Sequence, residues 1–340
     1  MILQTQALCQ SQSWQQALAD VIRDPQELFD YLKLDKSQLP AAIRAAKDFP
    51  LRIPRAFAER MIKGNWNDPL LQQVLPTGLE LDPQPGFSSD PLEEANSNPL
   101  PGLIHKYHGR VLLIVSGGCA INCRYCFRRH FPYGDNNPGR KQWAQTLQYI
   151  ADDSSIHEVI FSGGDPLAAS DALLSELVEQ LAQIPHVKTL RVHSRLPIMI
   201  PQRINDDCLR WLSNSRLRVV MVIHSNHPQE FDPAVGQALA RLGDAGVTLL
   251  NQSVLLAGIN DDAETLAALS HRLFSYGVLP YYLHLLDRVK GAAHFEVSEP
   301  LAKQLIKQLT AQLPGYLVPK LVREEAAANS KTPIPYASNS

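Results

Sequence analysis

Long apolar runs are absent from this 340-residue sequence: no stretch of about 18 apolar residues is present that could span a bilayer. Neither sign of charge predominates, because 32 Lys and Arg residues nearly balance 34 Asp and Glu residues and leave a net charge of −2. Such a chain carries no broad electrostatic footprint for DNA or RNA. Residues Met1 to Trp14 contain no basic region followed by an apolar run, so we expect no secretory signal. These absences predict a cytoplasmic protein without a membrane or nucleic-acid partner.

Cysteine is scarce and unevenly placed. Of the 5 cysteines, three fall within one short segment, while Cys9 and Cys208 stand far from it. An odd number with this clustering is a poor disulfide framework. We therefore interpret Cys9 and Cys208 as incidental and look for chemistry in the clustered set, which consists of Cys119, Cys123 and Cys126.

From residue 110 onward, short apolar and β-branched runs alternate with helical patterns. The runs begin near residues 110, 157, 187, 217, 247 and 279, and each is nearly continuous, as in strands buried on both faces. Helical patterns lie between them, over 141–152, 171–183, 204–213, 233–244 and 262–276. The spacing of about 30 residues is the size of a βα unit. Six units predict an α/β fold with a parallel sheet, either a partial (β/α)6 barrel or an open doubly wound sheet.

Three regions are expected along the chain. Residues 1–101 form a helical N-terminal extension, with short helices over 13–24 and 25–34 and a closing linker over 83–101 that is rich in Pro, Ser, Gly and Asn. Residues 102–290 form the core of βα units. Residues 291–340 contain a C-terminal helix and a terminal segment.

Polar residues gather where the predicted strands end. In parallel α/β sheets the carboxyl ends of the strands form one functional edge, whether the sheet is a barrel or open. The residues found there are the three clustered cysteines, Gly163-Gly164-Asp165, His193 to Arg195, His224 to His227, and Asp287. The sequence therefore predicts one large active site at this edge. His193, His224 and His227 could line it or could be packed, hydrogen-bonded residues.

The segment from Cys119 to Cys126 has CxxxCxxC spacing and follows a strand and a Gly117-Gly118 turn. Three thiolates on one loop can hold a four-iron, four-sulfur cluster and leave one iron without a protein ligand. An open metal position is where a substrate can bind and react. In radical S-adenosylmethionine (SAM) enzymes, SAM takes that position. The glycines of Ser162-Gly163-Gly164-Asp165 would let the backbone approach such a ligand closely.

A zinc site is the structural alternative for the same cysteines. His130 would complete a Cys3His set with Cys119, Cys123 and Cys126. Zinc knuckles seldom lie between a buried strand and a helix, which favours the iron–sulfur interpretation. A ferredoxin that only transfers electrons would want a fourth cysteine, and neither Cys9 nor Cys208 is suitably placed.

Several segments together carry a family resemblance. They read CRYCFRRHF from Cys123, SGGDPL from Ser162, SRLPIMIPQRI from Ser194, HSNHPQE from His224 and NQSVLLAGIND from Asn251. They resemble the lysine 2,3-aminomutase family, and in particular its short form, which makes (R)-β-lysine for the modification of elongation factor P. The resemblance implies a radical SAM partial barrel and an isomerase that moves the amino group of free L-lysine. It also implies an external reductant such as flavodoxin or ferredoxin, and a functional link to the ligase that attaches β-lysine to elongation factor P.

The resemblance also assigns cofactor-binding positions. It implies that Lys331 carries pyridoxal 5′-phosphate (PLP) covalently and that Arg110 and Lys106 lie near it. It places Gly163, Gly164 and Asp165 around the SAM amino group, with Gln252 near SAM. Taken alone, Lys331 would be read as a solvated lysine of the terminal segment.

Substrate-binding positions follow from the same resemblance. Arg128 corresponds to the arginine that binds the substrate carboxylate, a task suited to a guanidinium with two parallel hydrogen bonds. Asp287 and Glu324 correspond to the carboxylates that bind the lysine ε-ammonium group, although either could be a surface acid. Paired carboxylates favour a cationic substrate over glutamate, while an aminomutase for another amino acid remains the rival enzyme. The rival from another class is a zinc-stabilised binding module.

Overall fold

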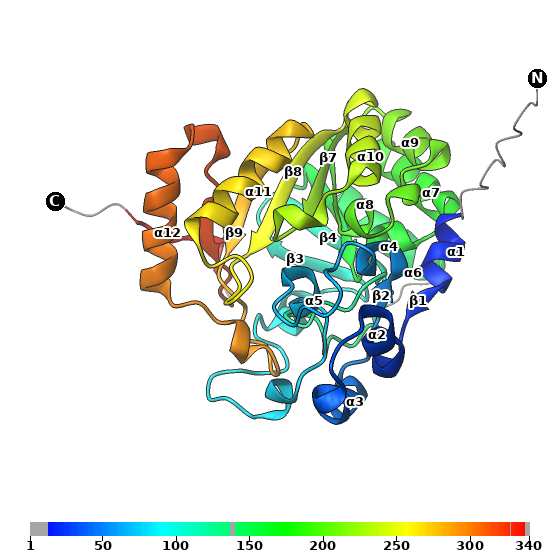
Figure 1. The fold of residues 1–340 in the computed structure, drawn as a ribbon. Coiled ribbons are helices and arrows are strands. Elements are labelled where there is room, and N and C mark those ends of the chain that lie inside the picture. Colours follow the sequence, from blue (N-terminus) through cyan, green and yellow to red (C-terminus); the bar gives the residue numbers. More distant parts are fainter. Residues whose placement is uncertain (1–12, 137–139, 327, 337–340) are drawn as a thin grey trace, which may run out of the picture.

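Nine strands form one open sheet at the centre of the protein, with helices packed around it (Figure 1). The computed structural model describes residues 13–136, 140–326 and 328–336. The strand order is β11-β10-β9-β8-β7-β6-β5-β4-β3, and among the described residues no pairing joins the two outer strands. Six neighbouring strands are parallel: β4 (Arg110–Ser116), β5 (Glu158–Gly163), β6 (Thr189–Ser194), β7 (Arg218–His224), β8 (Thr248–Val254) and β9 (Leu279–His284). The partial barrel of six βα units is thereby confirmed.

Helices alternate with these strands. They are α6 (Arg140–Asp152), α7 (Asp171–Ala182), α9 (Asp206–Ser213), α10 (Pro233–Asp244) and α11 (Ala263–Ser275), with the single turn α8 (Leu196–Met199) after β6. Of these, α7, α9, α10 and α11 begin at polar capping residues. Ser170 accepts a hydrogen bond from Leu173 N at the start of α7, and Asp232 accepts one from Val235 N at the start of α10. Such caps satisfy backbone donors that a helix leaves unpaired. Each helical connection thus carries the chain back to the end of the sheet where the next parallel strand begins.

The sheet extends beyond the six predicted strands at both edges. β3 (Leu103–Tyr107) pairs antiparallel with β4, and β10 (Lys320–Arg323) pairs parallel with β9 after helix α12 (Glu299–Gln312). The two-residue β11 (Thr332–Pro333) then pairs antiparallel with β10. Sequence analysis missed these strands because they are short and lack a long β-branched run. Their position matters, since β10 and β11 bring the end of the chain back to the sheet.

The N-terminal extension lies against the loops that follow the strands. Its elements are α1 (Trp14–Ala19), β1 (Val21–Ile22), α2 (Pro25–Leu32), α3 (Leu39–Asp48), β2 (Ile53–Pro54), α4 (Arg55–Ala58) and α5 (Pro69–Gln72). The helix expected over residues 13–24 is wrong in extent: it ends at Ala19, because the buried, β-branched Val21 and Ile22 pair with β2. Asn122 N donates to Arg52 O and Arg124 N to Gln73 O, so the extension is bonded directly to the cysteine loop.

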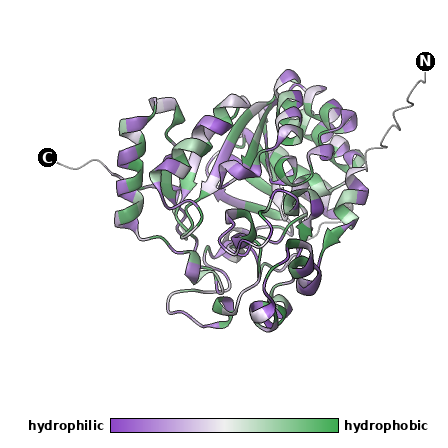
Figure 2. Ribbon diagram, in the orientation of Figure 1, coloured by the Kyte–Doolittle hydropathy of each residue, from purple (hydrophilic) through white to green (hydrophobic). Residues whose placement is uncertain are grey.

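One main apolar core joins these layers. It runs from Phe29, Phe57 and Leu71 of the extension to Phe161 of β5 and Leu239 of α10, all fully buried. In Figure 2 the helices around the sheet alternate hydrophilic and hydrophobic ribbon segments, as amphipathic helices do. Within the described residues, no helix has the length and apolar character needed to cross a membrane.

Candidate active site

A cavity of about 510 Å³ opens among the carboxyl ends of the strands and continues into the sheet. Its volume is in the usual range for small-molecule sites. Every site residue predicted from the sequence lies on its wall: Cys119, Cys123, Cys126, Arg128, Gly163, Gly164, Asp165, Gln252, Asp287, Glu324, Lys331, Arg110 and Lys106. Residues from β3 to the segment after β10 are thus gathered by the fold into one space.

The cysteine loop is held by buried ion pairs to the extension. Arg124 is fully buried, and its Nε donates to Glu80 of the short 3-10 helix η2 (Gly78–Leu81) at 2.8 Å. Arg129 Nη2 donates to the same carboxylate at 2.9 Å. Both guanidinium groups lie over the Phe49 ring, at 4.7 and 4.5 Å from its centroid. The loop is therefore fixed by paired charges rather than by its own hydrogen bonds alone.

The environment of the thiols suits a metal cluster. Burial and the neighbouring thiols raise the pKa of Cys119 well above its ordinary value and that of Cys126 to about 12. Bound iron reverses this preference, because a metal ion stabilises the thiolate. In the described residues, no three His, Cys, Asp or Glu side chains are grouped to hold a single ion. The thiolates of a cluster bind different irons, so this spacing does not oppose the iron–sulfur interpretation.

His130 does not join the cysteines. It is absent from the cavity wall, and its imidazole lies near Arg129, Asp48 and the backbone of Lys290. The described residues therefore do not form the Cys3His zinc site, because His130 is not grouped with the thiols. Of the other two cysteines, Cys208 is buried in α9, and Cys9 lies outside the described residues.

The glycine turn after β5 lies directly against the cysteine loop. Gly163 has φ of +119°, which favours glycine, and a Cβ on Gly164 would lie 2.6 Å from Gly118 O. Gly164 N donates to Ser116 O and Asp165 N to Gly118 O, both at 2.8 Å. The glycines therefore allow two backbone segments to approach each other beside the thiols.

The Asp165 carboxylate is hydrogen-bonded to other groups of the protein. Its carboxylate accepts hydrogen bonds from Ser194 Oγ at 2.7 Å, Arg195 N at 2.8 Å, Leu167 N at 3.0 Å and Leu196 N at 3.1 Å. Burial raises its pKa to about 6 even though these bonds oppose the rise. Asp165 thus fixes the glycine turn to the end of β6.

Arg128 is already paired with a carboxylate. Its Nε and Nη2 donate to the two oxygens of Glu94 at 2.7 and 2.6 Å, and both side chains are buried. Its Nη1 donates to Ser162 Oγ and Gly163 O, each at 3.3 Å. Glu94 belongs to η3 (Glu94–Ser97), inside the segment expected to be only a linker. Sequence analysis missed Glu94, because nothing in a Pro- and Asn-rich segment marks one acid as buried.

The two carboxylates predicted for the ε-ammonium group differ in their surroundings. Asp287, three residues after β9, has a side chain that no hydrogen bond or ion pair joins to the described part of the chain. Burial and nearby Glu324 raise its pKa to about 7. Glu324 forms ion pairs with Lys331 and Lys106 and accepts a hydrogen bond from Tyr107 Oη at 2.7 Å. Burial alone would raise the pKa of Glu324, but these partners lower it to about 2.

Cations line the inner part of the cavity. Lys106 on β3, Arg110 at the start of β4 and Arg191 within β6 all reach its wall, and Arg191 forms an ion pair with Glu158. The Arg110 guanidinium lies over the Tyr107 ring, 4.9 Å from its centroid. Arg191 and Tyr107 were not predicted, since a strand interior gives no sign of which residues face a cavity. The site therefore extends from the carboxyl ends into the barrel.

Three histidines meet at the carboxyl ends of β6, β7 and β9. His193, His224 and His284 line the cavity, and burial lowers the pKa of each, that of His224 to about 3. His227 is instead a packed residue, whose Nδ1 accepts a hydrogen bond from Gln229 N at 3.1 Å. His193 thus lies on the cavity wall, and His224 both lines the cavity and pairs with Tyr125 Oη through its Nε2 at 3.1 Å; His284 was not singled out from the sequence.

Comparison with known proteins agrees with this arrangement. Residues 113–269 match the profile of the Radical SAM superfamily. Together with three thiols and a glycine turn on one cavity, this match defines the chain as a radical SAM enzyme.

Curated relatives narrow the class further. L-lysine 2,3-aminomutase of Escherichia coli (strain K12) is 53% identical over 324 residues, covering 95% of this chain and 94% of that protein. The enzyme of Haemophilus influenzae is 51% identical, covering 95% and 96%. The enzyme of Clostridium subterminale is 33% identical, and the match covers 94% of this chain and 77% of that protein. The chain belongs to the L-lysine 2,3-aminomutase family of isomerases.

Membership in this family brings three cofactors: a [4Fe-4S] cluster, SAM and PLP. The residues present fit them. Three thiols share one cavity for the cluster, and Gly163 and Gly164 lie on the wall of the same cavity, where SAM would bind next to the cluster. A lysine amine, Lys331, stands with Lys106 and Arg110 on the same wall for an aldehyde that carries a phosphate. A cavity that holds three thiols, a lysine amine and two further cations suits an enzyme with these cofactors better than a protein that only binds a partner.

Proposed function

We propose that this chain converts L-lysine to β-lysine of R configuration by moving the amino group from Cα to Cβ. The observation that carries the proposal is Asp287, a partly buried carboxylate that no hydrogen bond or ion pair joins to the described residues, on the wall that also holds Arg128, Lys331 and the three thiols. In its ionised form, an unpaired acid in a cavity is stabilised by a cation. The ε-ammonium group of lysine supplies one, while its carboxylate suits Arg128.

Each residue then has a task. Cys119, Cys123 and Cys126 bind the cluster, and Gly163, Gly164, Asp165 and Gln252 shape the SAM side of the cavity. Lys331 binds PLP, with Lys106 and Arg110 as cationic neighbours for its phosphate. When bound, the cluster and SAM supply a carbon radical, and PLP supplies the ring system that carries the migrating nitrogen. The protein orients the substrate from both ends and keeps water from the reacting carbons.

Glu324 serves two cations in turn. In the described structure its carboxylate binds the Lys331 ammonium group. Glu324 lies where its carboxylate would hold the Lys331 side chain as an ammonium group, or would share the substrate's ε-ammonium group with Asp287. Tyr107 and Lys106 keep the carboxylate in place throughout.

Arg128 must exchange partners in this proposal. Glu94 holds the Nε and Nη2 edge of its guanidinium, one of the two edges that can bind a carboxylate with two parallel bonds, and Nη1 of the other edge donates to Ser162 Oγ and Gly163 O. The substrate carboxylate therefore displaces Glu94 from this edge. The segment that contains η3 would move with it.

The proposal is tested by anaerobic incubation of the purified protein with L-lysine, SAM, PLP and a reductant, followed by chiral analysis of the products. (R)-β-lysine that depends on SAM and on intact Cys126 is the expected result. Formation of β-glutamate or β-arginine from the corresponding amino acid, with lysine inert, would favour the rival aminomutase instead. The Cys208→Ala variant is the matched control, because Cys208 is buried in α9 and does not line the cavity.

We also propose that the product serves a ligase that attaches β-lysine to elongation factor P, with a cytoplasmic flavodoxin or ferredoxin as the source of electrons. Support comes from the resemblance to the short enzymes and from the near-complete overlap with the Escherichia coli relative. In cells without this chain, elongation factor P should lose the mass of one β-lysyl group, and added β-lysine should restore it. An unchanged mass would remove this link and leave the enzymatic proposal intact.

A further inference from the structure

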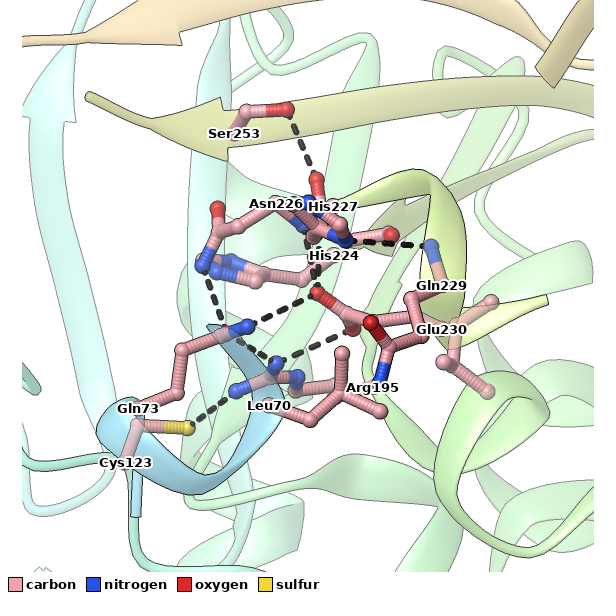
Figure 3. A network of polar contacts seen from close by, with 12 residues as sticks. Leu70, Gln73, Cys123, Arg195, His224, Asn226, His227, Gln229, Glu230 and Ser253 are labelled. Atoms are coloured by element: carbon pink, nitrogen blue, oxygen red, sulfur yellow. Dashed lines mark hydrogen bonds and ion pairs between the residues drawn. The ribbon is translucent and has the colours of Figure 1, made fainter. Parts of the chain in front are cut away.

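Arg195 is buried beside the cysteine cluster and donates directly to one of its sulfurs. It follows the last residue of β6, with a side chain about 7% exposed. Its Nη1 donates to Cys123 Sγ at 2.7 Å and to Tyr125 Oη at 2.8 Å. Figure 3 shows the guanidinium at the centre of a polar network, with Cys123 on one side and Glu230 on the other. None of the roles given above uses this residue.

The position of Arg195 does not depend on the cysteine. Its Nη2 donates to Gln73 Oε1 at 2.6 Å and to Glu230 Oε2 at 3.0 Å. Glu230 is fully buried and is itself fixed, because its Oε1 accepts from Asn226 N at 2.8 Å and from His227 N at 3.1 Å. Two protein acceptors therefore hold one end of the guanidinium, and the other end is directed at the sulfur.

The backbone of Arg195 is held as well. Its N–H donates to Asp165 Oδ2 at 2.8 Å, so a hydrogen bond joins it to the segment of the glycine turn. Gln73 follows α5 in the N-terminal extension, and its backbone oxygen accepts from Arg124 N of the cysteine loop. The glycine-turn segment, the N-terminal extension and the segment after β7 thus all bind Arg195, which donates to Cys123 Sγ.

The charge distribution gives this donor a consequence for electron transfer. Hydrogen bonds to the sulfurs and nearby charge set the reduction potential of an iron–sulfur cluster. A guanidinium remains charged at any physiological pH, and burial leaves its field largely unscreened. Because Glu230 lies at the far end, the positive end faces the sulfur. Added negative charge on the cluster is therefore stabilised.

We propose that Arg195 is a positioning residue that makes the cluster easier to reduce by donating a hydrogen bond to Cys123 Sγ. The inference rests on the proposed role of Cys123 as a cluster ligand. The step concerned is a one-electron reduction, in which the external reductant loses one electron, the cluster gains it, and no covalent bond changes. Arg195 thus adjusts the first step of the reaction without touching the substrate.

The test is a redox titration followed by electron paramagnetic resonance, on protein with iron and sulfide contents matched between variants. Two variants probe Arg195. Arg195→Lys keeps the charge and loses the planar fork, and the double variant Arg195→Gln with Glu230→Gln removes both buried charges so that neither is left unpaired. Arg203→Lys is the matched control, since Arg203 is fully buried, pairs with Asp171 and does not line the cavity.

The expected result is a more negative midpoint potential in both Arg195 variants. In the double variant the ratio of reduced to oxidised cluster at a fixed potential should fall about tenfold, which equals about 59 mV for one electron. Arg195→Lys should shift in the same direction by less, and Arg203→Lys should match the wild type even if it melts earlier. A purely structural role would lower stability in all three variants without this order of potentials.

Two outcomes separate the inference from the proposal beneath it. Equal potentials in the wild type and in fully loaded Arg195 variants would overturn the role of Arg195 and leave the cysteine site standing. A wild-type protein that takes up no iron and sulfide would overturn the cysteine site, and this inference with it. Arg195→Lys keeps the test decisive if the double variant fails to fold, because it leaves the charge of Glu230 paired.

Discussion

Replacing Asp287 by Asn should weaken lysine binding strongly while leaving the fold intact. The change keeps the shape of the side chain and removes its charge. Asp287 has no partner in the described part of the chain, so the substitution breaks no internal hydrogen bond. Its pKa of about 7 lies above the ordinary 3.8, so the ionised form costs stability above pH 7. The variant should therefore melt at the same temperature as the wild type or higher.

The size of the binding effect follows from the contact that is lost. A hydrogen bond to a charged group contributes about 1.5–3 kcal/mol. Since about 1.4 kcal/mol is a factor of ten, KM for lysine should rise about 10- to 100-fold. The change in kcat should be smaller, because Asp287 holds the end of the substrate away from the reacting carbons.

The assay is anaerobic turnover with lysine, with L-norleucine as a competitor that lacks the ε-ammonium group. The inhibition constant of norleucine should not change in Asp287→Asn. Glu296→Gln is the control acid, because Glu296 forms a surface ion pair with Arg288 and does not line the cavity. An unchanged KM for lysine in Asp287→Asn would refute the reasoning.

Three further predictions follow from the same geometry. Since protonated Asp287 cannot bind a cation, kcat/KM for lysine should fall as pH drops below about 7, and Asp287→Asn should lose this dependence in a pH profile. Glu94→Gln should lower KM for lysine several-fold, because the substrate carboxylate no longer displaces a charged competitor from Arg128; a raised KM in steady-state assays would speak against displacement. Gly164→Ala should weaken SAM binding and destabilise the fold by about 1–3 kcal/mol, since its Cβ would meet Gly118 O at 2.6 Å. Gly134→Ala, with nothing within 4 Å of the added carbon, is the control in calorimetry, and equal effects of the two would contradict the steric argument.

Much of the active site could be located from the sequence, because many of its residues stand at the ends of successive strands in the repeating βα units. The βα rhythm places residues such as Gly163 and His224 at the ends of parallel strands, and such ends share one edge of a sheet by construction. The spacing of Cys119, Cys123 and Cys126 needs no tertiary information, since it lies on one loop. Lys331 was different: only the resemblance singled it out, and the structure shows why it reaches the cavity, because β10 and β11 return the chain to the sheet.

The sequence by itself thus determined the parallel α/β class, the thiol loop and the glycine turn, because local spacing and strand periodicity encode them. Only the tertiary structure decided the partners. It paired Glu94 with Arg128, left Asp287 without a hydrogen-bond or ion-pair partner among the residues that the structure describes, and directed Arg195 at Cys123. These contacts join residues far apart in the chain, and their energies depend on burial. Burial depends on how all the segments pack together, so it cannot be inferred from the sequence of any one segment.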